Sequence, residues 1–195
     1  RFHAEGKIKE AKQYYENFIN EGFKDHRVFS NYGMILKNSG KLKEAELFTR
    51  KAIEIKPDFA FAYYNLGIIM SNIGNLQEAE LFTKKAIEIK TDFVDAYYNL
   101  GVILSNIGNL QEAELYIRKA IKIKPDFAVA YSDLGGIFVK LGKLQKAELY
   151  LQKAIELDPK NKLIENNLIS LLTIYQPKKI SSNPLYLINQ EFKNL

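Results

Sequence analysis

Side chains that commonly carry out catalysis or bind metals are scarce in this sequence of 195 residues. It contains no cysteine, and its two histidines, His3 and His26, stand without a convergent cluster of carboxylates. The spacings of a nucleophile elbow, a zinc-protease helix, a phosphate-binding loop and a dinucleotide-binding loop are all missing. We therefore predict no catalytic residue, no metal site and no cofactor, and we expect that the chain is not an enzyme.

The charged residues are mixed in sign, with 28 Lys and Arg against 23 Asp and Glu. Several form pairs four residues apart in the order that stabilises a helix, namely Glu46 with Arg50, Glu80 with Lys84, and Glu114 with Arg118. This interleaving indicates an outer helix face and not a stripe that follows phosphates, so we expect no nucleic-acid partner. The sequence shows no signal peptide and no apolar run of membrane-spanning length, which together with the missing cysteines favours a cytoplasmic protein without a membrane partner.

One polar position recurs every 34 residues, at Asn31, Asn65, Asn99, Asp133 and Asn167. The asparagine side chain offers one acceptor and two donors, which suits a peptide group. A row of such side chains is predicted to bind the backbone of an extended peptide, and Asp133 would favour an amine or a basic side chain. The alternative is that these asparagines form hydrogen bonds within or between neighbouring helices.

Three aromatic residues, Phe61, Tyr64 and Tyr98, occupy positions close to this row and are predicted to form a binding patch. Each hydrogen bond contributes only about 0.5–1.5 kcal/mol net, so a few asparagines supply modest affinity. The aromatic patch, or repetition over a longer array, must then supply most of the binding free energy.

The same 34-residue period organises the whole chain. The segments Tyr63–Phe82 and Tyr97–Tyr116 differ at three positions, and we number each unit 1 to 34 from His26, Ala60, Val94 and Ala128. A first helix (A) is expected to run to the glycine at position 15, which can adopt the positive φ that ends a helix. A second helix (B) follows and ends before position 32, which is proline in three of the units.

Inside a unit, small residues at positions 8 and 20 allow helices A and B to approach closely. Large residues at positions 4, 7 and 11, such as Tyr97, Leu100 and Leu104, recur at helical spacing and are predicted to form the core between the two helices. Positions 2, 5, 6, 9, 12 and 13 of helix A are then left for binding.

This pattern, with Leu and Gly at positions 7 and 8, Ala at 20 and 27 and Pro at 32, resembles the tetratricopeptide repeat. Position 4 carries Phe or Tyr where members of that family often have Trp. The resemblance implies an all-α fold, a right-handed α-solenoid of stacked helix-turn-helix repeats whose A helices line a concave groove.

The repeat divides the chain into four segments. Residues 1–25 form an N-terminal half repeat with helix B alone, 26–161 form four repeats (26–59, 60–93, 94–127 and 128–161), 162–175 form a capping helix, and 176–195 form a linker and short C-terminal segment. The half repeat leaves its apolar face partly open, so we expect the chain to come from a longer array.

Two more specific resemblances concern the ligand. The segments Tyr63–Gly67 and Tyr97–Gly101 are similar to the asparagine ladder in the repeats of O-linked N-acetylglucosamine transferase. The carboxylate clamp of heat-shock co-chaperones, in contrast, uses Lys and Asn on the first A helix, where this sequence has Ser30 and Met34, and two basic residues on the third, where it has Asp95 and Asn99. Chaperone C-terminal tails are therefore not the expected ligand.

The leading hypothesis is a protein-interaction scaffold that binds an extended peptide or partner protein in the groove. One alternative is a substrate-recruiting arm of a larger modifying enzyme, such as a glycosyltransferase. Another is a self-assembly module that acts through the open N-terminal face or the C-terminal tail.

Overall fold

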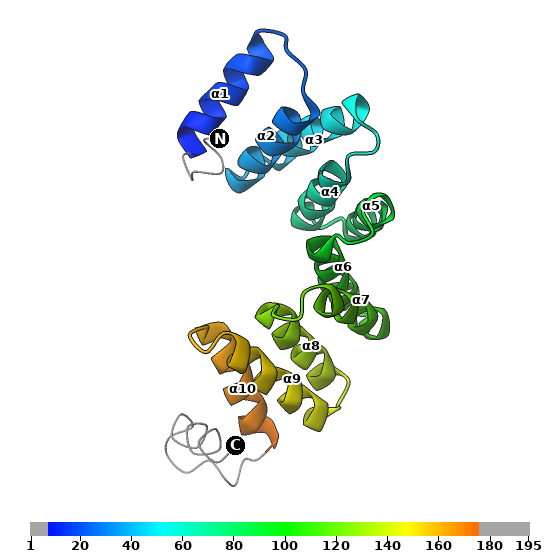
Figure 1. Cartoon of the computed structure of the whole chain (residues 1–195), viewed down its shortest axis with the longest axis vertical. Helices are drawn as coiled ribbons and strands as arrows, with labels where there is room; N and C mark the ends of the chain where they lie inside the picture. The colour runs from blue at the N-terminus through cyan, green and yellow to red at the C-terminus, as the bar shows by residue number, and fades with distance from the viewer. Residues whose placement is uncertain (1–7, 176–195) are drawn as a thin grey trace. The chain divides into compact units, whose positions relative to one another are not determined.

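The computed structural model describes residues 8–175, and every regular element in this range is an α-helix (Figure 1). The helices are α1 (Ile8–Asn20), α2 (His26–Asn38), α3 (Leu42–Ile55), α4 (Ala60–Ile73), α5 (Leu76–Ile89), α6 (Val94–Ile107), α7 (Leu110–Ile123), α8 (Ala128–Lys140), α9 (Leu144–Leu157) and α10 (Lys162–Tyr175). The predicted all-α helical repeat fold is confirmed. His3 and the predicted C-terminal segment 176–195 lie outside the described residues.

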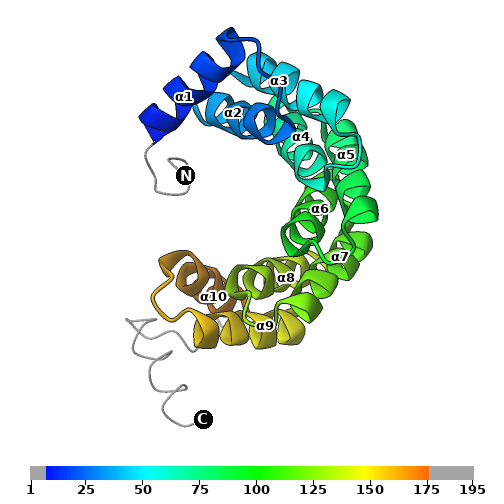
Figure 2. The ribbon, with the colours of Figure 1, turned by 45° about the horizontal axis from the view of Figure 1, so that its top comes forward.

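The chain forms two compact units, residues 1–103 and residues 104–195, and the division falls within α6. In the first unit the A helices α2 and α4 pack on the B helices α3 and α5, and α4 also contacts α2 and α3 (Figure 2). In the second unit α8 packs on α9, and α10 contacts both of them.

The core between paired helices uses the predicted positions 7 and 11. Both positions are buried in all four repeats, and their residues are Tyr32, Leu36, Leu66, Met70, Leu100, Leu104, Leu134 and Phe138. Position 4 differs from the expectation, because Phe29 is buried but Tyr63, Tyr97 and Tyr131 are only half-buried. A tyrosine can pack its ring while its hydroxyl reaches the surface.

Positions 3 and 10 of helix A are also buried, although they were not expected in the core. Position 10 is isoleucine in every repeat (Ile35, Ile69, Ile103 and Ile137), and position 3 is a buried alanine in three repeats. These two positions are two helical turns apart, so they form a second apolar stripe on helix A. In the first unit, Ile35, Ile69 and Ile103 belong to the same core cluster and join successive repeats.

The small residues at positions 8 and 20 bring helices A and B into close contact. A Cβ atom added to Gly33 would meet the Thr49 side chain and lie 3.1 Å from the backbone oxygen of Ala45. In the fourth repeat, a Cβ atom on Gly135 would lie 2.7 Å from Cγ of Leu151. Glycine at position 8 is therefore required by the opposing helix and not by the backbone conformation.

The turn between helices A and B depends on the glycine at position 15. Gly40, Gly74, Gly108 and Gly142 all have positive φ, between 71° and 94°. After two of these turns an asparagine caps helix B, since the side chains of Asn75 and Asn109 accept hydrogen bonds from the backbone N–H of Glu78 and Glu112.

The outermost described helices also bury apolar faces. In α1, Ala11 and Tyr15 are buried in the core cluster of the first unit, while Ile8 remains exposed. In α10, Ile164, Leu168 and Leu171 are buried, and Ile164 packs with Ala128 and Ala154.

The two adjacent glycines of α8 give a matched test of the close contact between helices. We expect Gly135→Ala to lower the free energy of unfolding by about 1–3 kcal/mol, because the added methyl group collides with α9. Gly136→Ala is the control, since a Cβ atom there has no neighbouring atom within 4 Å. It is expected to raise the free energy of unfolding by about 0.5–1 kcal/mol through better helix propensity. Urea unfolding of both variants measures the difference, and equal effects would contradict the proposed packing role.

Candidate functional site

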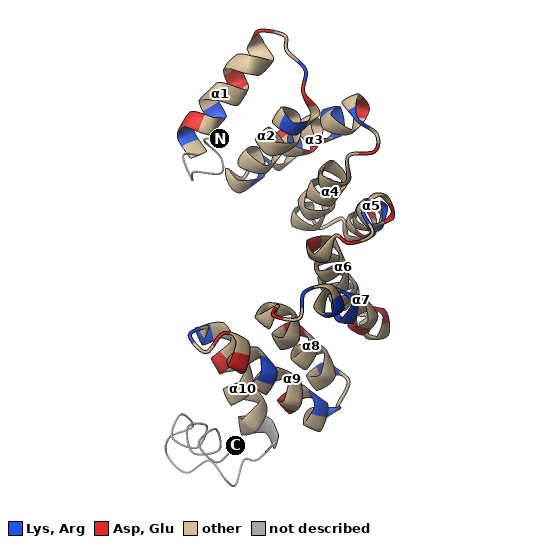
Figure 3. Cartoon of the chain, viewed as in Figure 1, with Lys and Arg blue, Asp and Glu red and all other residues tan. Residues whose placement is uncertain are grey.

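The candidate site lies on the A helices of the first unit, on the side turned away from the B helices. The charges of the α4–α5 pair belong entirely to α5, so α4 presents a neutral surface (Figure 3). Arg27, Phe61 and Asp95 occupy position 2 of α2, α4 and α6, and all three are exposed.

The position-6 asparagines of the first unit have different surroundings. Asn31 is exposed on α2. Asn65 is half-buried on α4, and its Nδ2 donates to Oγ of the buried Ser30 on α2 over 2.9 Å. One N–H of the Asn65 amide therefore forms a hydrogen bond between neighbouring A helices, as the alternative interpretation of this position expected.

Asn99 differs from Asn65 because its amide nitrogen has no partner. Within the range that the structure describes, Nδ2 of Asn99 is buried and donates to no acceptor. Ser30 precedes Asn65 by 35 residues, and the residue 35 positions before Asn99 is Tyr64. The serine acceptor is thus replaced by an aromatic side chain, and a buried donor is left unsatisfied at a cost of about 1–3 kcal/mol.

The second unit shows the serine arrangement again. Nδ2 of Asn167 on α10 donates to Oγ of the buried Ser132 on α8 over 3.0 Å. Asp133, the position-6 residue of α8, is half-buried. A position-5 serine therefore holds the next position-6 asparagine in each unit.

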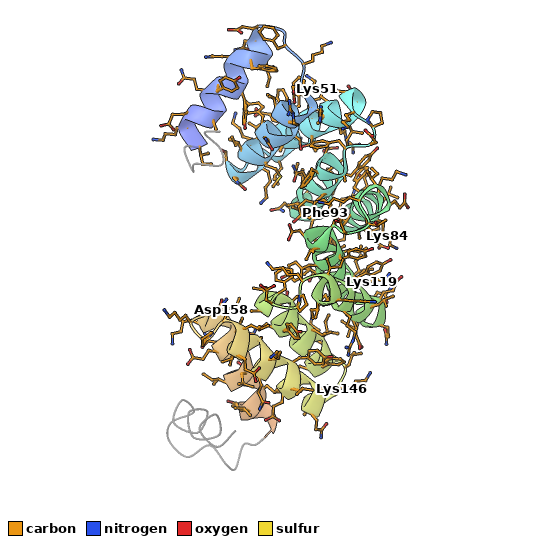
Figure 4. All side chains as sticks on the ribbon, in the orientation of Figure 1. Lys51, Lys84, Phe93, Lys119, Lys146 and Asp158 are labelled. Carbon is orange, nitrogen blue, oxygen red and sulfur yellow. The ribbon has the colours of Figure 1, made fainter. Side chains whose placement is uncertain are left out.

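Two residues of the predicted aromatic patch, Phe61 and Tyr64, lie against a third ring that was not predicted. The rings of Phe61 and Tyr64 lie 4.8 Å and 4.9 Å from the ring of Phe93, centroid to centroid. Phe93 is buried in the loop between α5 and α6 (Figure 4). Phe61 remains 46% exposed, and Tyr98 is half-buried on α6.

Electrostatics keep the Tyr64 hydroxyl protonated. Burial raises the pKa of Tyr64 to about 12, and the negative charge of Asp95 contributes in the same direction. Lys90 Nζ lies 5.1 Å from the ring centroids of both Phe61 and Phe93, which is a cation–π distance. The patch is therefore an aromatic surface with a neutral hydroxyl and a cation beside it.

Two features could have indicated more of this site from the sequence. Phenylalanine occupies position 34 in the first three repeats, as Phe59, Phe93 and Phe127. Serine at position 5 in the first and fourth repeats, with tyrosine in the other two, separates the repeats into two kinds. Neither feature suggests a ring contact or a hydrogen bond until the neighbouring helices are placed.

The described residues were also compared with what a histidine site, a metal site or a membrane-spanning helix would require. The ring of His26 packs edge-on against Phe59 at 4.6 Å, a structural contact. Within residues 8–175, no group of three or more His, Cys, Asp or Glu side chains could hold a metal ion. No helix in that range is long and apolar enough to cross a membrane.

Comparison with protein families identifies the repeat. Family models described as tetratricopeptide repeat match residues 26–59, 48–80, 94–127 and 128–161, which together cover more than half of the chain. Comparison with curated proteins gives no match.

Solved structures share the fold. MamA is 27% identical, with a TM-score of 0.72, over 82% of this chain and 93% of the other. YrrB, described as a TPR protein with an unusual peptide-binding site, is 22% identical, with a TM-score of 0.68, over 85% of each chain. A MamA fragment from Desulfovibrio magneticus RS-1 is 20% identical, with a TM-score of 0.74, over 87% of this chain and 96% of the other. The likeness to the transferase repeats stays a prediction.

The raised pKa of Tyr64 predicts a pH dependence of stability. A phenol whose pKa is higher in the folded state than its ordinary value near 10 stabilises the fold below pH 10, and this contribution is lost as the pH rises toward 12. Tyr64→Phe is therefore expected to lose less stability than the unchanged protein between pH 10 and 12.

Urea unfolding at several pH values measures this effect. Tyr14→Phe, at an exposed position of α1, is the control and is expected to follow the unchanged protein. Tyr32 also has a pKa raised to about 12, by burial and by a hydrogen bond to Glu16, so part of the alkaline destabilisation remains in either variant. Identical pH profiles for Tyr64→Phe and the unchanged protein would contradict the burial of this hydroxyl.

Proposed function

Because the chain belongs to the tetratricopeptide repeat family, we propose that it is a protein-interaction scaffold that binds an extended peptide segment. The segment lies on the A helices of the first unit and contacts Asn65, Asn99 and the aromatic patch of Phe61, Tyr64 and Tyr98. Asn31 is a further candidate contact of the first unit. Asp133 and Asn167 are the candidate contacts of the second unit, taken by itself. Repeats of this kind commonly use the surface of their first helices for binding.

The observation that carries this proposal is the unsatisfied amide nitrogen of Asn99. A buried donor without an acceptor costs free energy, and a peptide carbonyl would supply that acceptor once the side chains that cover Nδ2 move aside. Asn65 and Asn167 already use one donor on a serine, so each has less to gain from a ligand. Asn99 is therefore proposed as the main contact with the peptide backbone.

The aromatic patch supplies the apolar part of the interaction. Phe61 is half exposed, and covering such a ring contributes up to about 1.5–3 kcal/mol. With about 1 kcal/mol for the Asn99 hydrogen bond, the total falls short of the roughly 8 kcal/mol of a micromolar complex. The bound segment must consequently span several residues and contact more than one repeat.

The structural neighbours agree with this class of function. YrrB is described as carrying a peptide-binding site, and at 22% identity its likeness to this chain concerns the fold. The fold is thus compatible with peptide binding, and the ligand of this chain follows from its own side chains.

Peptides selected from a random library for binding to the whole chain provide the probe for a test. We expect Asn99→Ala to lower the affinity for the selected peptide about three- to tenfold, because one hydrogen bond to the peptide backbone is lost. The same substitution removes a buried donor without a partner, so the melting temperature is expected to stay unchanged or to rise. Calorimetric titration and thermal unfolding measure the two effects.

Asn17→Ala is the matched control, since Asn17 is exposed on α1, a helix that carries none of the candidate contacts. It is expected to leave peptide affinity unchanged. Equal affinity of the Asn99→Ala variant and the unchanged protein would reject this site. Failure of any peptide to be enriched would reject the proposed function.

A further inference from the structure

The start of α6 carries a carboxylate that the repeat pattern does not balance. Each linker between consecutive repeats has one basic and one acidic residue, namely Lys56 with Asp58, Lys90 with Asp92, and Lys124 with Asp126. Asp95 follows at position 2 of α6, where the other repeats have Arg27, Phe61 and Val129. The rest of α6 and the whole of α4 are uncharged (Figure 3). Asp95 is therefore an additional negative charge on two otherwise neutral A helices.

Asp95 also differs from the charged residues around it in having no partner. It is exposed, and within residues 8–175 its carboxylate forms no hydrogen bond and no ion pair. Arg27, at the same position of α2, forms an ion pair of 2.8 Å with Asp25. Lys90, in the linker before α6, lies 5.1 Å from the ring centroids of two phenylalanines. The carboxylate of Asp95 is consequently available to a ligand.

Aromatic rings lie close to this carboxylate. The negative charge of Asp95 contributes to the raised pKa of Tyr64, so the carboxylate is near enough to act on the phenol. Tyr64 packs against Phe93, which directly precedes α6 (Figure 4), and Phe61 packs against the same ring while 46% of its own surface stays exposed. Aromatic faces attract cations, and a carboxylate beside them attracts the same charge. The combination favours a cationic group of the ligand.

Asp95 and Asn99 are placed so that one peptide can contact both. They are four residues apart on α6, and side chains at this spacing share one side of a helix, with about 5–6 Å between their Cβ atoms. An extended peptide advances about 3.3 Å per residue. A peptide whose carbonyl oxygen reaches Nδ2 of Asn99 can therefore present a side chain to Asp95 from a residue one or two positions away.

We propose that Asp95 binds an arginine or lysine side chain of the peptide, so that the ligand of this scaffold is a basic extended segment. This inference rests on the proposed function, because the basic residue is presented by the peptide that Asn99 holds. The carboxylate accepts hydrogen bonds from the basic group, and the exposed ring of Phe61 contacts its apolar stem. Arginine fits better than lysine, since a planar guanidinium can bond a carboxylate through two N–H groups and stack on a ring.

The overall charge of the chain makes this preference a discriminating one. The formal net charge is +5 at pH 7, so non-specific attraction favours acidic peptides. Lys90 adds a positive charge close to the aromatic patch, and Asp92 in the same linker offsets it. A preference for basic peptides therefore opposes the charge of the whole chain and reports the local carboxylate of Asp95.

Parallel peptide selections on the whole chain test the charge preference. One random library lacks Lys and Arg, and the other lacks Asp and Glu. We expect enrichment from the library that contains Lys and Arg, with a basic residue at one fixed position of the enriched sequences. On the Asp95→Lys variant the preference for a basic residue at that position is expected to disappear, because like charges are then opposed.

Calorimetric titration of an enriched peptide, and of a copy whose basic residue is replaced by alanine, measures the contact. Asp95→Asn is expected to lower the affinity for the enriched peptide about three- to tenfold and to leave the affinity for the alanine copy unchanged, because that copy lacks the partner. Asp58→Asn is the matched control, since it changes the net charge equally at an exposed residue of the linker before α4. It is expected to leave both affinities unchanged. Circular dichroism verifies that the variants remain folded, since exposed substitutions have small effects on stability.

Four outcomes would overturn the inference. They are enriched peptides without a basic residue at a fixed position, equal affinity of Asp95→Asn and the unchanged protein, an equal loss for the alanine copy, and an equal loss in Asp58→Asn. If peptides are enriched and Asn99→Ala still weakens them, each of these outcomes leaves the proposed function in place. If neither library yields an enriched peptide, the proposed function and this inference are both rejected.

Discussion

The close contact between helices A and B is the interaction on which the rest of the structure depends. A glycine at position 8 and an alanine at position 20 leave no room for a larger side chain, as the surroundings of Gly33 and Gly135 show. Since the two backbones approach so closely, the residues at positions 7 and 11 meet the opposing helix and are excluded from water. Each helix then has one apolar side toward its partner, and the remaining sides become available for contacts with neighbouring repeats and with other molecules.

Contacts between successive A helices determine what position 6 can do. Where position 5 of the preceding helix is serine, as at Ser30 and Ser132, the asparagine of the next helix donates to it. Where position 5 is Tyr64, the amide nitrogen of Asn99 has no acceptor within the described residues, and the tyrosine packs against Phe93 instead. A single residue type in one repeat thus changes the chemistry of the following repeat, and similar asparagines acquire different roles.

The two helix types differ in how uniform their surfaces are. The B helices α3 and α5 have nearly the same sequence, including an exposed leucine at position 22 and its flanking charges, whereas the A helices α2 and α4 differ at positions 2, 5 and 9. A varied surface suits an asymmetric ligand such as a peptide, which presents different groups along its length.

The helices, their turns and the main core positions could be predicted from the sequence alone, because the 34-residue period, the glycine at position 15 and the spacing of large residues act within one repeat. The burial of positions 3 and 10, the Asn65–Ser30 bond and the isolation of the Asn99 amide could not, since each depends on side chains about one repeat apart in the chain. The sequence thus determined the repeat and its candidate side chains. Only the tertiary structure decided which of those side chains already have partners, because hydrogen bonds between helices depend on the distance and direction of atoms that sequence spacing does not specify.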